Sequence, residues 1–230
     1  MADAPNPRSP VHKRARDLEG RVLERAEARG KHLIVHLSGG LAVHSHLGMN
    51  GRWRIAADGA APFGKPWLVL SSGRGVAAQN GGQILRIASE SRIRNDPQLA
   101  RLGPDPLAAD FDLPAAARRL LSAGAGREIG EALLDQTIIA GIGNAIRNGA
   151  LFNARISPWR RTETLAPEDA ELAIAESQAI MRVALERGRR PRSIYRAERR
   201  GCPRCRGPVA VRGQGDANRM AYWCPRCQPG

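Results

Sequence analysis

All four cysteines lie near the C-terminal end of the sequence, in two pairs with the same spacing, Cys202-Pro203-Arg204-Cys205 and Cys224-Pro225-Arg226-Cys227. A Cys-x-x-Cys turn offers two thiolates to one metal ion, and two such turns supply the four sulfur ligands of a tetrahedral zinc site. We therefore expect Cys202, Cys205, Cys224 and Cys227 to hold one structural zinc ion. The alternative is a pair of disulfides, which is disfavoured because no secretory signal is recognisable.

The segment between the cysteine pairs is long enough to fold back as a β-hairpin. It carries Arg206, Arg212 and Arg219 and almost no acid. The chain of 230 residues is itself strongly basic, with a formal net charge of +14. Such a charge predicts a salt-sensitive attraction to polyanions, nucleic acid first and an acidic membrane surface second. These features indicate a nucleic-acid-binding protein, although each arginine could also be an ordinary solvated residue.

The first half of the chain has the pattern of short strands. Apolar and polar residues alternate, or β-branched residues dominate, over residues 32–37, 41–47, 52–55, 67–72, 75–79 and 83–89. Residues 1–16 are basic and rich in proline, and we interpret them as a loose arm. We expect residues 17–101 to form an all-β domain, either a sandwich or a barrel.

The second half has helical periodicity, so the whole chain is expected to be α+β. A linker rich in proline and aspartate, residues 102–113, precedes a helical domain over residues 114–196 and a zinc-binding hairpin over residues 197–230. The expected helices cover residues 115–123, 129–140, 145–152 and 167–188. No run approaches the ~18 apolar residues of a membrane span, so we expect no membrane partner.

A Gly-x-Gly-Asn turn joins two of these helices, in the segment LLDQTIIAGIGNAIRN (133–148). We expect Asn144 to be the N-cap of the second helix, whose first backbone N–H groups could bind a phosphate. Read by itself, this motif is as consistent with an ordinary turn between helices.

This segment resembles the helix–two-turn–helix signature of the formamidopyrimidine-DNA glycosylase/endonuclease VIII family. GDANRMAYWCPRCQ (215–228) resembles the zinc finger of that family, and EARGKHLIVHLSGGLAVHSHLGMNGRWRI (27–55) resembles its N-terminal β-sandwich. The motifs follow in order along nearly the whole chain, and they are nearer to the endonuclease VIII side. The resemblance implies a β-sandwich, a helical domain and a zinc-finger hairpin.

The resemblance also implies roles for individual residues. Lys31 matches a lysine that lies near phosphate and takes part in strand cleavage, and Met49 matches the wedge that fills the gap left by a flipped-out base. Asn144 and Arg219 match phosphate contacts from the helical motif and the finger. Without the resemblance, Lys31 and Arg219 would be read as solvated surface residues and Met49 as core packing.

The sequence departs from the family pattern at its beginning. Family members start, after removal of Met, with a Pro and a Glu that supply the catalytic amine and a proton-transfer group. This sequence begins Met1-Ala2-Asp3-Ala4-Pro5, and its internal prolines carry amide nitrogens that cannot replace the amine. We therefore expect that the catalytic Pro-Glu helix is absent from this sequence.

Three functions are compatible with these observations. The first is a DNA glycosylase/AP lyase that acts on oxidised bases or abasic sites, with Lys31 as the amine in this chain. The alternative is a non-catalytic zinc-finger protein that binds damaged or abasic DNA. A zinc ribbon on an unrelated scaffold, binding RNA, is a third possibility. We expect duplex DNA with a damaged base or abasic site as the partner, a monomer, and a bacterial cytoplasmic location at the nucleoid.

Overall fold

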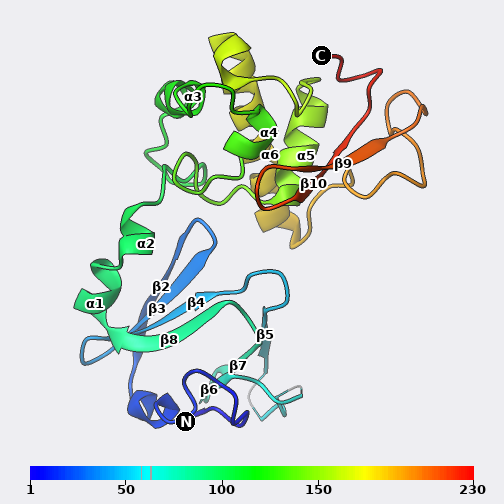
Figure 1. Cartoon of the computed structure of the whole chain (residues 1–230). Coiled ribbons are helices and arrows are strands. Elements are labelled where there is room, and N and C mark those ends of the chain that lie inside the picture. The colour runs from blue at the N-terminus through cyan, green and yellow to red at the C-terminus, as the bar shows by residue number, and fades with distance from the viewer. Residues whose placement is uncertain (58, 63) are drawn as a thin grey trace. The chain divides into compact units, whose positions relative to one another are not determined.

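The computed structural model describes residues 1–57, 59–62 and 64–230. The chain divides into two compact units, Met1–Arg101 and Leu102–Gly230, which are coloured blue to green and green to red in Figure 1. The N-terminal unit is mainly β and the C-terminal unit mainly helical with a terminal hairpin, so the expected α+β class is confirmed. Within the described residues, no helix combines the length and hydrophobicity that crossing a membrane requires.

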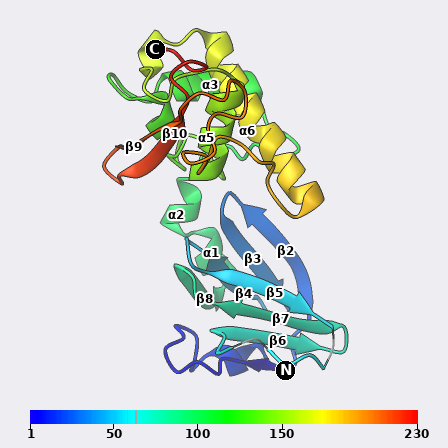
Figure 2. The same cartoon turned by 90° about the vertical axis from the view of Figure 1, so that its right-hand side faces the viewer.

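The N-terminal unit contains two four-stranded antiparallel sheets (Figure 2). One sheet has the order β2-β3-β4-β8, formed by Leu23–Arg29, His32–Leu37, Leu41–His46 and Ile84–Ser89. The other has the order β1-β6-β7-β5, formed by Ala2–Asp3, Leu68–Ser72, Gly75–Asn80 and Arg52–Ala56. Buried apolar side chains of both sheets form one core, as expected for a β-sandwich.

Strict alternation on β3 gives its sheet two different faces. Val35 and Leu37 point into the sandwich core, whereas His32, Ile34 and His36 lie on the opposite face. Two short helices follow β8, α1 (Glu90–Arg94) and α2 (Pro97–Ala100), and α1 contacts β4 and β8. Neither of these short helices was predicted from the sequence.

The first 16 residues are not the loose arm that their composition suggested. Ala4, Val11 and Ala15 are buried in the sandwich core. The segment is also held by polar contacts, because the Arg14 guanidinium donates to the carbonyl of Ile87 at 2.7 Å. A short 3-10 helix, η1 (Ala15–Leu18), leads from it toward β2.

The C-terminal unit is built from helices α3 (Leu113–Leu121), α4 (Ile129–Ala132), α5 (Asn144–Asn153) and α6 (Pro167–Arg187), with a 3-10 turn, η2 (Thr162–Thr164), before α6. Their apolar faces share one core. The helix expected over residues 129–140 ends at Ala132, because two polar side chains bond to the backbone beyond it. Asp135 Oδ1 accepts from the N–H of Thr137 at 2.8 Å, and Gln136 Oε1 accepts from the N–H of Gly141 at 3.0 Å. The resulting turns carry the chain to α5.

Candidate functional site

In the N-terminal unit, Lys31 lies at the tip of the two-residue turn between β2 and β3. Gly30 has a φ of 57°, which a two-residue hairpin turn of this kind requires at its first position. The next residue, His32, pairs with His46 at the end of β4. The Lys31 turn and the loop that follows β4 therefore leave the sheet at the same end.

The loop after β4 presents Met49, whose side chain is 80% exposed. This loop rests on the turn before β8. A Cβ at Gly51 would come within 2.5 Å of the Leu47 carbonyl oxygen and 2.7 Å of the Gly82 Cα, so only glycine permits this approach. An exposed apolar side chain on a loop held in this way is suited to entering an apolar or stacked environment.

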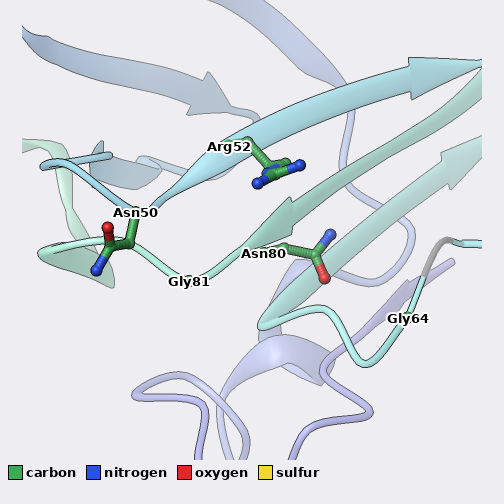
Figure 3. A pocket seen from close by; sticks show the side chains of 5 residues that line it. All are labelled: Asn50, Arg52, Gly64, Asn80 and Gly81. Carbon is green, nitrogen blue, oxygen red and sulfur yellow. The ribbon is translucent and has the colours of Figure 1, made fainter.

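A pocket of about 310 Å³ lies beside this loop (Figure 3). It is lined by Asn50, Arg52, Gly64, Asn80 and Gly81. Arg52 and Asn80 are paired across β5 and β7, so their side chains reach the pocket from neighbouring strands. The pocket brings amide and guanidinium groups together, one of them on Asn50, the residue after Met49, and none of these groups was predicted from the sequence.

In the C-terminal unit, α5 is clamped to the terminal hairpin of β9 (Ala210–Gln214) and β10 (Arg219–Trp223). Asn144 Nδ2 donates to the Met220 carbonyl at 3.1 Å, and Asn148 Oδ1 accepts from the Tyr222 N–H at 2.6 Å. Asn144 is the first residue of α5 and Gly143 occupies the N-cap, one position earlier than expected. The Asn144 side chain is thus used to hold β10 and does not cap its own helix.

The centre of this clamp is Arg147, which is completely buried. Its guanidinium donates to Asn144 Oδ1 at 2.5 Å, to the Gly130 carbonyl at 3.2 Å, to the Met220 and Arg219 carbonyls at 3.3 and 3.4 Å, and to Gln214 Oε1. Burial lowers the pKa of Arg147 to about 10. The guanidinium therefore stays charged at neutral pH, and every one of these acceptors is an uncharged oxygen.

The exposed side chain of Arg219 begins β10 beside the clamp. The structure therefore brings together two residues singled out in the sequence, Asn144 and Arg219, through a third that was not singled out. The first turn of α5 lies at the same place, and its backbone N–H groups have no partner within the helix. Positive charge, helix dipole and amide donors together make a local environment suited to an anion.

The four cysteines converge at the open end of the hairpin. Their sulfur atoms lie within 4.8 Å of one another, with 3.8 Å between Cys202 and Cys227 and 3.5 Å between Cys205 and Cys224. Tetrahedral zinc with Zn–S bonds of about 2.3 Å requires sulfur atoms about 3.8 Å apart, so the donor set fits. The cysteines are free thiols and not disulfides. The expected four-sulfur cluster is confirmed as a group that could hold a metal ion.

The cysteine turns are attached to the helical part of the unit. Cys202 and Cys224 pack with Phe152 and Ile194 in one apolar cluster. Gln228, next to the last cysteine, donates to the Ile156 carbonyl at 2.8 Å and accepts from the Cys224 N–H at 3.1 Å. A metal at this site would therefore fix the ends of the hairpin that the α5 clamp holds.

Both halves of the chain match family models. Residues 2–83 match the formamidopyrimidine-DNA glycosylase N-terminal domain, and residues 102–195 match the formamidopyrimidine-DNA glycosylase H2TH domain. The chain is 35% identical to a probable endonuclease 8 2 of Streptomyces coelicolor, over 93% of this chain and 82% of that protein. It is also 35% identical to endonuclease 8 1 of Mycobacterium tuberculosis, over 92% of this chain and 85% of that protein.

Solved structures show the same fold. The crystal structure of Lactococcus lactis Fpg in complex with DNA that contains an oxidised pyrimidine has a TM-score of 0.82 and 24% identity, over 100% of this chain and 91% of that one. The same glycosylase bound non-covalently to DNA with an abasic site has a TM-score of 0.78 over the same shares of the two chains. With both domain models matched in order and relatives aligned over most of their length, this chain belongs to the formamidopyrimidine-DNA glycosylase/endonuclease VIII family.

Proposed function

We propose that this protein is a base-excision DNA glycosylase and AP lyase whose substrate is duplex DNA with an oxidised base or an abasic site. The observation that carries the proposal is the α5–β10 clamp. It joins Asn144 and Arg219, which are distant in the sequence, at the N-terminus of α5, and the four-cysteine cluster lies at the other end of the same hairpin. Relatives named endonuclease 8 and a neighbour bound to abasic DNA support the same reading. The protein acts as a monomer in the bacterial cytoplasm, at the nucleoid.

DNA contacts come from both units in this proposal. Met49 enters the base stack where the damaged nucleotide is flipped out, since its exposed apolar side chain can fill that gap. Asn144, Arg219 and the first turn of α5 contact backbone phosphates near the lesion. Zinc is the metal proposed for Cys202, Cys205, Cys224 and Cys227, because four thiolates in a tetrahedral arrangement suit it best.

Lys31 is the amine proposed for strand cleavage by this chain. A neutral lysine amine adds to the C1′ aldehyde of an open-ring abasic sugar, and loss of water gives a Schiff base. Loss of a C2′ proton then expels the 3′ phosphate by β-elimination, and hydrolysis returns the amine. The turn between β2 and β3 holds Lys31 at the same end of the sheet as the Met49 loop.

Borohydride trapping of this 230-residue chain on duplex DNA with one abasic site tests this function. Hydride reduces the Schiff base to a stable secondary amine, so a lyase leaves a covalent protein–DNA band. We expect the band with the wild type and its loss in Lys31→Ala. The matched control is Lys65→Ala, which removes another exposed lysine of the same unit and should leave the band unchanged.

The control matters because basic proteins cleave abasic sites to some extent without a defined site. Equal trapping by the wild type, Lys31→Ala and Lys65→Ala would refute the assignment of Lys31. No band in any protein, with selective binding to the abasic duplex, would support the alternative of a protein that binds damaged DNA without acting on it.

A further inference from the structure

Four histidines lie on the face of the β3–β4 pair that points away from the sandwich core, and three of them, His32, His44 and His46, cluster at one end of it. His32 pairs with His46 across the two strands, and His44 is opposite Ile34 one step further along. His44 is completely buried, whereas His32 and His46 are partly exposed at the end of the sheet near Lys31. The rings of His32 and His46 are 4.6 Å apart between centroids.

The hydrogen bonds around His44 determine which of its ring nitrogens carries hydrogen. Arg86 Nε–H donates to His44 Nδ1 at 3.0 Å, and a guanidinium can only donate. His44 Nδ1 is therefore the acceptor, and the hydrogen of the neutral ring is on Nε2. His44 Nε2 lies 2.8 Å from His32 Nδ1 and donates to it. By the same argument, neutral His32 carries its hydrogen on Nε2.

The inner end of this series of hydrogen bonds is fixed by Asp96. Its carboxylate forms an ion pair with Arg86 and also accepts from the N–H groups of Gln98 and Leu99, at 2.8 and 3.2 Å, as the N-cap of α2. Asp96 is itself buried. Arg86 is thus held in one orientation. Its hydrogen bond fixes the ring of His44, and the bond from His44 fixes the ring of His32.

His32 and His44 are neutral at physiological pH. Burial is the main reason that the pKa values of His32 and His44 fall to about 4, and the charge of Arg86 lowers both further. His46 accepts from the Gly48 N–H through Nδ1 at 3.3 Å, and burial and Lys31 lower its pKa as well. Lys31, the neighbour of His32 in the chain, also lowers the pKa of His32.

This arrangement is built for a hydrogen bond and not for a metal. The lone pair of His32 Nδ1 and the hydrogen of His44 Nε2 are used on each other, so the two rings cannot both ligate through these atoms. Among the described residues, only the four cysteines form a group with metal-ligand geometry. The structure records no acceptor for the Nε2–H of His32 among the described residues. This donor lies at the partly exposed end of the hydrogen-bonded series, on the residue that follows Lys31.

We propose that Asp96, Arg86 and His44 form a positioning relay that holds His32 as a neutral Nε2–H donor, and that this N–H contacts a phosphate oxygen of the DNA strand next to Lys31. The proposal rests on the proposed function for its ligand, whereas the relay itself can be tested without DNA. A neutral donor binds phosphate at every pH above its pKa, so its contact does not depend on protonation near neutrality.

The relay is tested by long-range ¹H–¹⁵N NMR of the ¹⁵N-histidine-labelled chain at pH 7, which distinguishes the two neutral tautomers and the imidazolium. We expect the Nε2–H tautomer for His32 and His44. Arg86→Met removes the donor and should give a mixture of tautomers at His44, whereas Arg86→Gln retains an N–H donor and should restore the single form. The control is Arg92→Met, at an exposed arginine on α1. An imidazolium or an Nδ1–H tautomer at His32 in the wild type would overturn the relay.

The contact is tested by the affinity for a duplex with one tetrahydrofuran abasic analogue, in a series in which single phosphates are replaced by neutral methylphosphonates. His32→Phe should weaken binding about three- to tenfold, the range expected for one hydrogen bond. One methylphosphonate should weaken binding by the wild type and have no further effect on His32→Phe. His32→Gln, which retains a donor, should restore part of the affinity and guards against a folding defect.

The outcomes separate the two proposals. If His32→Phe binds as tightly as the wild type, the phosphate contact is refuted while the NMR result can still establish the relay. If the wild type does not prefer the lesion duplex to undamaged DNA, the proposed function and the phosphate contact fail together, whatever the tautomers are.

Discussion

Each unit of the chain organises a network around one arginine, and the two networks balance its charge differently. In the N-terminal unit, Arg86 pairs with the carboxylate of Asp96 and donates a hydrogen bond to the buried imidazole of His44. In the C-terminal unit, Arg147 is fully buried and donates only to carbonyl and amide oxygens. The first network has a nearby negative charge, whereas the second depends on the position of its acceptors.

This difference has consequences for how each network responds to change. An ion pair attracts over several ångströms, so the Arg86 network should tolerate small displacements. Neutral acceptors compensate for the dehydration of Arg147 only at hydrogen-bond distance. The Arg147 network is thus sensitive to the placement of β10, and β10 is followed directly by a cysteine turn. The metal and the clamp are therefore expected to stabilise each other.

Removal of the metal should produce the largest effect and should be confined to one network. Structural zinc supplies about 10 kcal/mol or more of folding free energy in zinc-finger peptides. We expect a strong chelator, or Cys224→Ser, to release one zinc per chain, to disorder the hairpin and to loosen the Arg147 clamp. Elemental analysis gives the stoichiometry, and amide hydrogen exchange gives protection in β10 and in β4.

If the metal supports only the Arg147 network, amide hydrogen exchange accelerates in β9 and β10 while β3 and β4 remain protected. A uniform loss of protection in both units would contradict it. If the hairpin kept its protection without metal, the clamp alone would be sufficient to hold β10.

Arg147→Met should have the next largest effect. The substitution keeps an apolar side chain in the space but leaves the oxygens of Gln214, Asn144 and the β10 backbone without their donor. Buried acceptors without partners cost about 1–3 kcal/mol each, and partial relaxation limits the sum, so we expect a loss of about 2–4 kcal/mol in the free energy of unfolding. Denaturant unfolding measures it, with Arg182→Met on the exposed side of α6 as the control.

The same variant tests the clamp directly. The Asn144 amide and the β10 N–H groups should shift in NMR spectra of Arg147→Met and not in those of Arg182→Met. An unchanged stability would mean that the dehydration of the guanidinium offsets its hydrogen bonds.

Acid should weaken the N-terminal network before the C-terminal one. The pKa values of His32 and His44 fall from 6.5 to about 4 on folding, so the unfolded chain binds more protons between these values. Stability contributed by the neutral rings is present above pH 6.5 and is lost as the pH falls toward 4, by on the order of 2 kcal/mol for this coupled pair. Burial raises the pKa of Asp96, but the hydrogen bonds from Arg86 and from the Leu99 and Gln98 N–H groups, with the charge of Arg86, together lower it below its ordinary value, so Asp96 stays ionised in this window.

Exchange protection of β3 and β4 at pH 7 and pH 4.5 measures this effect. We expect protection to decrease at the lower pH in the wild type, and to decrease less in His44→Gln, which cannot be protonated. Equal losses in the two proteins would assign the acid sensitivity to other groups.

The sequence predicted the features that depend on local spacing. Two Cys-x-x-Cys turns predict a four-sulfur cluster, and the alternating strands predict an all-β domain, for which the family resemblance favoured a sandwich over a barrel. The sequence also pointed to α5, but not to the side-chain bonds of Asp135 and Gln136 that end the preceding helix early. Those bonds compete with the helix only because the turn is packed against its neighbours.

Neither network could be read from the sequence. Arg147 is one of 36 basic residues, and its burial depends on where the β10 carbonyls lie after folding. Asp96 before Pro97 is a recognisable helix start, yet its second role as the partner of Arg86 depends on the packing of α1 against the sheet and of α2 against α1. Positions that meet only in the tertiary structure leave no spacing signal in one sequence.

The exposed side chain of Arg219 gives the smallest expected effect and the sharpest contrast with Arg147. Its backbone carbonyl takes part in the clamp, but its side chain lies outside the buried network, so Arg219→Ala should leave the free energy of unfolding nearly unchanged. Its loss should instead appear in DNA binding: a phosphate contact contributes about 0.9 to the slope of log K against log salt. We expect Arg219→Ala to lower that slope by about one and Arg182→Ala to leave it unchanged. An unchanged slope for Arg219→Ala would show that its charge does not contact phosphate. The contrast between Arg147, which stabilises the fold, and Arg219, which binds DNA, would then fail.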